Sequence, residues 1–122
     1  RRAAAKRYDH LLVGSGVGLP QQMDYARHVY HIYAVRTTER AALQEALNAQ
    51  GVQTGIHYPF PVHLLPAFAD LGYHAGQFPH SERAANEVLS LPMFPELTAE
   101  QSAAVSAAVH AFGKRSLLAQ VA

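Results

Sequence analysis

The chain has 122 residues, with 10 Lys and Arg against 9 Asp and Glu, eight His, and neither Cys nor Trp. A chain of this length with 49% apolar residues can bury a core as one globular domain without disulfides or metal. Its net charge of +1 argues against a nucleic-acid partner, and the lack of Cys excludes disulfides, thiolate zinc sites and a cysteine nucleophile.

The first part of the chain predicts a helix and a linker. Apolar residues recur at helical spacing from Arg1 to Leu12, as in an amphipathic surface helix. The glycine-rich segment Gly14–Pro20 lacks the preceding strand and the following Lys-Ser/Thr of a phosphate-binding loop. We therefore interpret it as a flexible linker, so that helix and linker occupy residues 1–27.

Two strands and a helix are predicted next. The segment Val29–Val35 is rich in β-branched and aromatic residues, which is typical of a buried strand. The pair Thr37–Thr38 can cap a helix that ends before Gly51. A second strand is expected over Val52–Tyr58, where a proline ends it because proline cannot donate to a sheet.

The rest of the chain alternates rigid loops with helices. Pro59–Pro66 predicts a stiff loop or a single helical turn, and residues 67–71 can add another turn. A third helix begins near Pro79, with Glu82 and Glu87 on its solvated surface. An extended segment, residues 89–95, then fits a short or edge strand.

The last helix has clear boundaries in the sequence. Thr98 and Gln101 have the spacing of a capping box, and Gly113 is the expected stop. Four residues form its predicted inward face: Val105, Ala108, Val109 and Phe112. We assign residues 1–113 to a single domain and residues 114–122 to a frayed tail.

These elements predict an α+β fold, with a small antiparallel or mixed sheet on which helices pack. Both predicted strands carry apolar residues on both faces, so helices on one side would leave an apolar face exposed. We expect that face to make the chain self-associate or only marginally stable. No apolar run approaches the length of a membrane span, and we expect a cytoplasmic location.

The histidines do not predict a metal site. His28 and His31 lie three apart at the start of a predicted strand, where residues at this spacing point to opposite faces, so they cannot share one ion. His57 and His63 could converge across the proline-rich loop, but no carboxylate stands at a ligand offset from them. The serines show no nucleophile elbow, and a hydrolase triad is not predicted either.

The segment Gly55–His63 is the candidate binding site. A strand end delivers His57, Tyr58 and His63 into a loop stiffened by two prolines, which fixes hydrogen-bonding groups at a low cost in entropy. A structural alternative stays open, in which Tyr58 packs in the core and His63 caps the turn that follows.

Several groups of residues, in one order along the chain, carry a family resemblance. They are His28-Val29-Tyr30-His31-Ile32-Tyr33, Arg36, Arg40, Gly55-Ile56-His57-Tyr58-Pro59-x-Pro61-x-His63, Leu71-Gly72-Tyr73, Phe78-Pro79-x-Ser81-Glu82 and Leu89-Ser90-Leu91-Pro92-Met93-Phe94-Pro95-x-Leu97-Thr98. Over residues 1–113 the chain closely resembles the C-terminal domain of the DegT/StrS-type sugar aminotransferases.

The resemblance implies the small C-terminal domain of a PLP-dependent enzyme with the aspartate-aminotransferase fold. Such enzymes move an amino group from an amino acid, commonly glutamate, onto a nucleotide-linked keto-sugar, and act as homodimers. The motif match assigns His57, Tyr58 and His63 to substrate binding, whereas Leu65 departs from the Gln found in many relatives.

In that family the N-terminal domain holds PLP and supplies the Schiff-base lysine. The only lysines here are Lys6 and Lys114, in the first helix and after the last one. We therefore expect no catalytic residue, no bound PLP and no activity from this chain alone. Because the sequence begins without Met, we expect a processed, truncated or excised piece. The alternative is a stand-alone, non-catalytic binding or dimerisation module.

Overall fold

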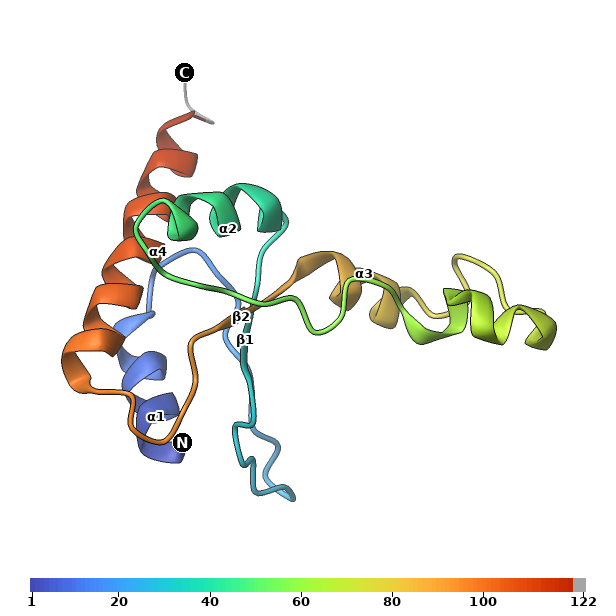
Figure 1. Cartoon of the computed structure of the whole chain (residues 1–122), viewed down its shortest axis with the longest axis horizontal. Coiled ribbons are helices and arrows are strands. Elements are labelled where there is room, and N and C mark those ends of the chain that lie inside the picture. Colours follow the sequence, from blue (N-terminus) through green and yellow to red (C-terminus); the bar gives the residue numbers. More distant parts are fainter. Residues whose placement is uncertain (120–122) are drawn as a thin grey trace.

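The computed structural model describes residues 1–119, which form helices and one two-stranded sheet. The elements in chain order are α1 (Arg2–Leu11), β1 (Tyr33–Arg36), α2 (Arg40–Asn48), the 3₁₀ helices η1 (Val62–Leu64) and η2 (Pro66–Leu71), α3 (Pro79–Glu87), β2 (Val88–Leu91) and α4 (Ala99–Ala119). Figure 1 shows α1, α2 and α4 gathered on one side of the two strands. The α+β prediction is confirmed.

The sheet consists of β1 and β2, which pair antiparallel with Tyr33 opposite Leu91 and Arg36 opposite Val88. Single bridges extend it at two further places. Gly18 pairs with Arg36 through two backbone bonds of 2.8 Å, and Gly55 pairs with Ser90 in the same way. The glycine-rich linker is therefore tied to the sheet edge at Gly18.

The two strands predicted for residues 29–35 and 52–58 differ from those in the structure. The first begins only at Tyr33, because Tyr30 has a φ of +50°, its backbone N–H donates to His28 Nδ1, and the chain bends at residues 31–32. The second prediction, over residues 52–58, is wrong. Only Gly55 pairs with a neighbour there, and the chain then leaves the sheet.

The helix starts are closer to their predictions. Thr37 Oγ1 accepts a hydrogen bond from the Glu39 backbone nitrogen at 3.1 Å, and α2 begins one residue later. The capping box of α4 is confirmed, because the side chains of Thr98 and Gln101 each accept a bond from the other's backbone nitrogen.

The prediction that Gly113 ends the last helix is wrong. The helix continues through Gly113 to Ala119. Instead of ending the helix, Gly113 lets the helix backbone lie close to the backbone of Ser15. A Cβ at position 113 would collide with the backbone carbonyl oxygen of Ser15. Of the tail predicted to be frayed, residues 114–119 belong to α4, and residues 120–122 lie outside the described part of the chain.

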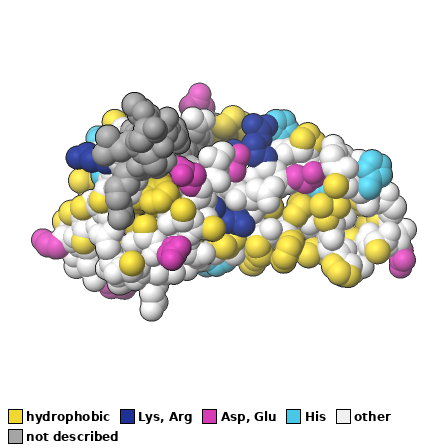
Figure 2. Space-filling view, turned by 90° about the horizontal axis from the view of Figure 1, so that it is seen from above, with side chains coloured by type: hydrophobic (Ala, Val, Ile, Leu, Met, Phe, Trp, Pro, Cys, Tyr) yellow, Lys and Arg dark blue, Asp and Glu magenta, His cyan; other side chains and the backbone are white. Residues whose placement is uncertain are grey.

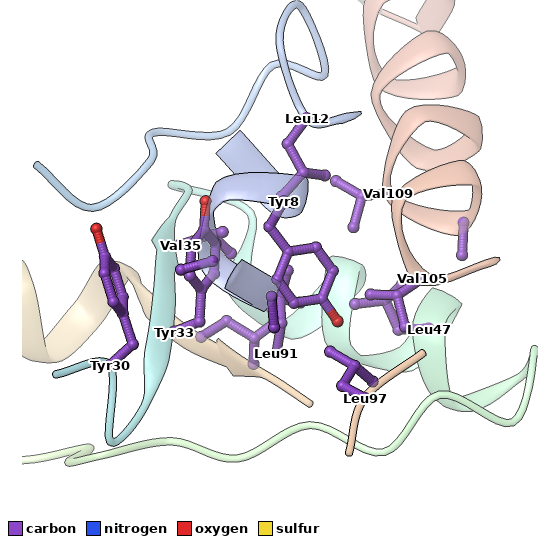
Figure 3. Packing of buried hydrophobic residues seen from close by; sticks show 14 of the residues in the cluster. Tyr8, Leu12, Tyr30, Tyr33, Val35, Leu47, Leu91, Leu97, Val105 and Val109 are labelled. Carbon is purple, nitrogen blue, oxygen red and sulfur yellow. The ribbon is translucent and has the colours of Figure 1, made fainter. Parts of the chain in front are cut away.

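The core lies between α1, α2, α4 and the sheet. The rings of Tyr8 and Tyr33, both without exposed surface, lie 5.0 Å apart between their centroids. Figure 3 shows Tyr8 projecting from α1 toward Leu91 of β2 and Val105 of α4. Val105, Ala108 and Val109 are buried as predicted, and Phe112 packs at the edge of the same core.

Residues 57–80, here called the arm, project away from this body and carry η1 and η2 (Figure 1). The predicted stiff loop and following turn are confirmed as these two short helices. Large hydrophobic side chains are exposed along the arm: Tyr58, Phe60, Val62, Leu64, Phe68, Leu71, Tyr73 and Phe78. The sheet itself does not carry the predicted exposed apolar face, because the consecutive residues Leu89, Ser90 and Leu91 of β2 are buried, so both faces of that strand are covered. Val29, which was expected in the first strand, lies outside the sheet and is 66% exposed.

None of the described helices is long and apolar enough to cross a membrane.

Candidate functional site

A pocket of about 530 Å³ lies where the arm meets α3. Its wall includes His57, Tyr58 and His63, the three residues that the sequence predicts as ligand-binding. Aromatic and aliphatic side chains of the arm and of α3 complete it. An apolar pocket with a few convergent polar groups is typical of a small-molecule site.

A hydrogen bond to a residue of the sheet holds the His57 side chain in place. Its Nδ1 lies 2.9 Å from Ser90 Oγ, and Ser90 is a buried residue of β2. The imidazole also lies against Gly55, where a Cβ would come within 2.7 Å of the ring. Gly55 and Ser90 are joined by two backbone bonds, so the strand end fixes this side chain at the pocket.

Tyr58 extends away from the body. It is 73% exposed, so the alternative in which it packs in the core is wrong. Its ring meets that of His57 edge-on, with centroids 5.6 Å apart. The phenol is therefore available to a ligand, while one edge of the ring rests on the imidazole.

His63 contacts α3. Its side chain is only 9% exposed, and Nε2 lies 3.1 Å from Glu82 Oε1. The alternative in which His63 caps the following turn is wrong, because η2 has no side-chain cap. The ring of Phe78 packs beside the imidazole, with the two ring centroids 4.8 Å apart.

The sequence pattern does not identify Glu82 as part of this site. Its carboxylate turns back to accept from the backbone nitrogens of Gly76 at 2.9 Å and Phe78 at 3.3 Å. The Gly76 bond chiefly, with those from Phe78 and His63, holds the pKa of Glu82 below its usual range. Its place in the first turn of a helix is the one signal in the sequence that could have indicated such a role.

Ser90 is the other missed residue. It belongs to a run that predicts an extended strand, and nothing local indicates that its hydroxyl meets His57. Glu87, expected on a solvated surface like Glu82, instead pairs with Arg36, with its Oε2 2.6 Å from Nη2.

The two lysines do not fit a PLP attachment site. Lys6 on α1 and Lys114 on α4 are both exposed, and neither lines the pocket at the arm or the second one of about 780 Å³ beside the glycine-rich segment. A Schiff-base lysine needs a setting that lowers its pKa, such as a desolvated pocket. Among the described residues, no three His, Asp or Glu side chains come together as metal ligands.

Comparison with known proteins identifies the class. The model of the DegT/DnrJ/EryC1/StrS aminotransferase family matches residues 1–110, and the chain belongs to this family. The predicted family resemblance is confirmed. The chain is 50% identical to a pleiotropic regulatory protein of Geobacillus stearothermophilus over 83% of its length, which is 28% of that protein.

Sugar-modifying relatives are similar to the chain over most of its length. It is 40% identical to the dTDP-3-amino-3,4,6-trideoxy-alpha-D-glucose transaminase of Streptomyces venezuelae, over 94% of the chain and 31% of the relative. The solved structure of S. venezuelae DesV superposes with a TM-score of 0.89 at 40% identity, covering 93% of this chain and 31% of that one. The chain therefore spans about 30% of the length of the relatives it matches.

Proposed function

We propose that this chain is the C-terminal, substrate-side domain of a PLP-dependent aminotransferase that acts on a nucleotide-linked keto-sugar. The pocket that gathers His57, Tyr58 and His63 is the observation that carries the proposal. In it the chain binds and orients the sugar through hydrogen bonds with two imidazoles and a phenol.

The relatives support the substrate class. Besides the dTDP-sugar transaminase above, a UDP-N-acetyl-3-dehydro-alpha-D-glucosamine 3-aminotransferase of Acidithiobacillus ferrooxidans is 40% identical over 89% of the chain. Glutamate as the amino donor is supported by a 3-oxo-glucose-6-phosphate:glutamate aminotransferase of Bacillus subtilis, 38% identical over 61% of the chain.

PLP is supported by the solved structure of B. subtilis NtdA with bound PMP, which superposes with a TM-score of 0.79 at 30% identity. Since Lys6 and Lys114 do not fit the cofactor, we place PLP and its lysine on an N-terminal domain outside this chain. The proposal further includes a homodimer and a cytoplasmic location. It also includes the absence of PLP from this chain on its own.

The test is kinetic, in the complete protein that contains this domain. His57→Ala and Tyr58→Phe are each expected to lower turnover of the keto-sugar about 2- to 12-fold, the effect of losing one hydrogen bond to an uncharged group. The unfolding midpoint should stay unchanged, because Tyr58 is largely exposed and His57 lies outside the core.

Tyr25→Phe is the matched control, since Tyr25 is 87% exposed on a loop that does not line the pocket. It is expected to leave turnover at the wild-type rate. Normal kinetics for His57→Ala and Tyr58→Phe, with a lower unfolding midpoint, would show that both residues serve the fold.

A stand-alone, non-catalytic module is the second candidate. It is favoured by one observation: the largest core residues, among them Tyr8, Tyr33 and Leu43, are fully buried within these 122 residues alone. The intact mass of the protein made by its natural source distinguishes the two candidates. A product of about three times this length supports the enzyme, and one of this length supports the module.

A further inference from the structure

One carboxylate oxygen, Glu82 Oε1, accepts hydrogen bonds from two residues that line the pocket at the arm, His63 and Phe78, and from Gly76. It lies 3.1 Å from His63 Nε2, 2.9 Å from the Gly76 nitrogen and 3.3 Å from the Phe78 nitrogen. Glu82 belongs to the first turn of α3, whereas His63 belongs to η1 on the arm. A single side chain thus ties the helix to three points of the arm.

These contacts determine which nitrogen of His63 carries the proton. The backbone donors keep the Glu82 carboxyl ionised, and an ionised carboxylate can only accept hydrogen bonds. His63 Nε2 must therefore be the donor. In a neutral imidazole the other nitrogen, Nδ1, is then an acceptor.

Packing fixes the ring in this orientation. Phe78 lies against the imidazole, and Tyr73 in turn meets Phe78 edge-on, with centroids 5.3 Å apart. His63 Nδ1 has no hydrogen-bond partner among the described residues, and His63 lines the pocket. The free acceptor is thus available for a ligand.

We propose that Glu82 is a positioning residue, which holds His63 in the Nε2–H tautomer and thereby presents Nδ1 as an acceptor to a hydrogen-bond donor of the ligand. A sugar hydroxyl is such a donor. The nature of the ligand rests on the proposed function, whereas the tautomer rests only on contacts within this chain.

The test reads the imidazole directly. In the isotope-labelled 122-residue chain, long-range ¹H–¹⁵N spectra near pH 8.5 distinguish the two neutral tautomers, above the ordinary titration range of histidine near 6.5. The His63 signal is assigned by its loss in His63→Gln. We expect the Nε2–H pattern in the wild type and a mixture of tautomers in Glu82→Ala.

Glu82→Gln is the conservative variant. Oε1 accepts from all three donors, and the Gly76 nitrogen also donates to Oε2 at 3.0 Å. The amide oxygen of Gln can take the place of Oε1 and retain the Nε2–H pattern, with the loss of the Oε2 contact alone. Glu87→Ala is the matched control, since Glu87 lies on the same helix but pairs with Arg36. It should leave the tautomer unchanged.

An Nδ1–H pattern in the wild type would overturn the proposal, and so would a pure Nε2–H pattern in a folded Glu82→Ala chain. If Glu82→Ala loosens the whole arm, the tautomer patterns of the wild type and of Glu82→Gln still test the proposal: an Nδ1–H pattern in either would overturn it. A merely structural role would lower the unfolding midpoint without setting the tautomer.

A second readout uses the complete protein. There Glu82→Ala should raise the KM for the keto-sugar by about 2- to 12-fold, and Glu82→Gln should restore it. A KM unchanged by Glu82→Ala would contradict the positioning role. An inactive wild-type protein would overturn the proposed function, while the tautomer measurement would still test the role of Glu82.

Discussion

The hydroxyl groups of Tyr8 and Tyr33 lie inside the core, and each has one acceptor. Tyr8 donates to the Pro92 carbonyl oxygen at 3.1 Å, and Tyr33 donates to Asp9 Oδ1 at 2.7 Å. Burial raises the pKa of Tyr8 to about 12. Burial, together with the hydrogen bond to Asp9, raises the pKa of Tyr33 further above its usual value.

Alkaline pH is therefore expected to unfold the protein. A tyrosine in the unfolded chain ionises near pH 10, whereas these two resist ionisation when folded, so the stability they contribute is complete below pH 10 and declines above it. The unfolding midpoint in denaturant should fall steadily between pH 10 and 12.

Tyr8→Phe should make that decline shallower, even if its stability at neutral pH is lower. The slope against pH is the relevant measurement, because the lost hydrogen bond to Pro92 lowers the midpoint at every pH. Tyr25→Phe should retain the wild-type slope. Equal slopes for all three proteins would contradict a contribution of Tyr8 to the pH dependence.

At the candidate site, the sequence predicted the residues of the loop but not their partners. His57, Tyr58 and His63 fall within seven positions, and prolines fix the direction of the chain between them. Their supports lie far along the chain: Ser90 is 33 residues from His57, and Glu82 is 19 from His63. Such contacts depend on how α3 and β2 return to the arm, which no local pattern encodes.

Among the elements, α4 allows a sharp test of the role of Gly113. Replacing a helix-interior glycine by alanine normally gains about 1 kcal/mol of stability. Here the new methyl group would meet the Ser15 carbonyl oxygen, and displacing packed backbone typically costs about 1–3 kcal/mol. Gly113→Ala is therefore expected to be neutral or destabilising in chemical unfolding.

Ala107→Gly calibrates this experiment, because Ala107 is exposed on the same helix and reports helix propensity alone. It should cost about 1 kcal/mol. A gain of about 1 kcal/mol for Gly113→Ala would mean that the linker at Ser15 moves aside freely, and the close packing would then be of no consequence.

The helices were easier to predict than the strands, for a physical reason. A capping box such as Thr98–Gln101 satisfies backbone groups within four residues, so the signal is complete in the sequence. Pairing of a strand depends on a distant partner. Residues 52–58 have the composition of a strand, but only Gly55 forms a β-bridge, with Ser90.

At the scale of the whole molecule, the chain consists of a closed body and an open arm. The body buries apolar side chains from α1, α2, α4 and both strands in one cluster. The arm has no such layer over its apolar side chains, and Figure 2 shows hydrophobic side chains gathered at the projecting end. The alternation of residues in the two predicted strands indicated an exposed apolar face on the sheet, whereas the exposed apolar side chains lie on the arm, because alternation alone cannot show that residues 57–80 leave the body.

This arrangement predicts self-association of the isolated chain through the arm. Soluble monomers rarely expose contiguous apolar patches beyond a few hundred Å². Phe60 and Leu71 are 66% and 61% exposed there, so burying them against a second copy removes apolar surface from water. Light scattering over a concentration series should show the apparent mass rising with concentration.

Charges placed on the arm should suppress this rise. The double variant Phe60→Lys and Leu71→Lys is expected to keep the chain monomeric with little change in its unfolding midpoint, because neither residue belongs to the core. Tyr25→Lys adds charge to an exposed residue outside the arm and should associate like the wild type. A wild-type chain that stays monomeric at high concentration, with a sharp cooperative melt, would show that the apolar side chains of the arm can stay exposed to solvent. That result would favour the stand-alone module over the enzyme domain.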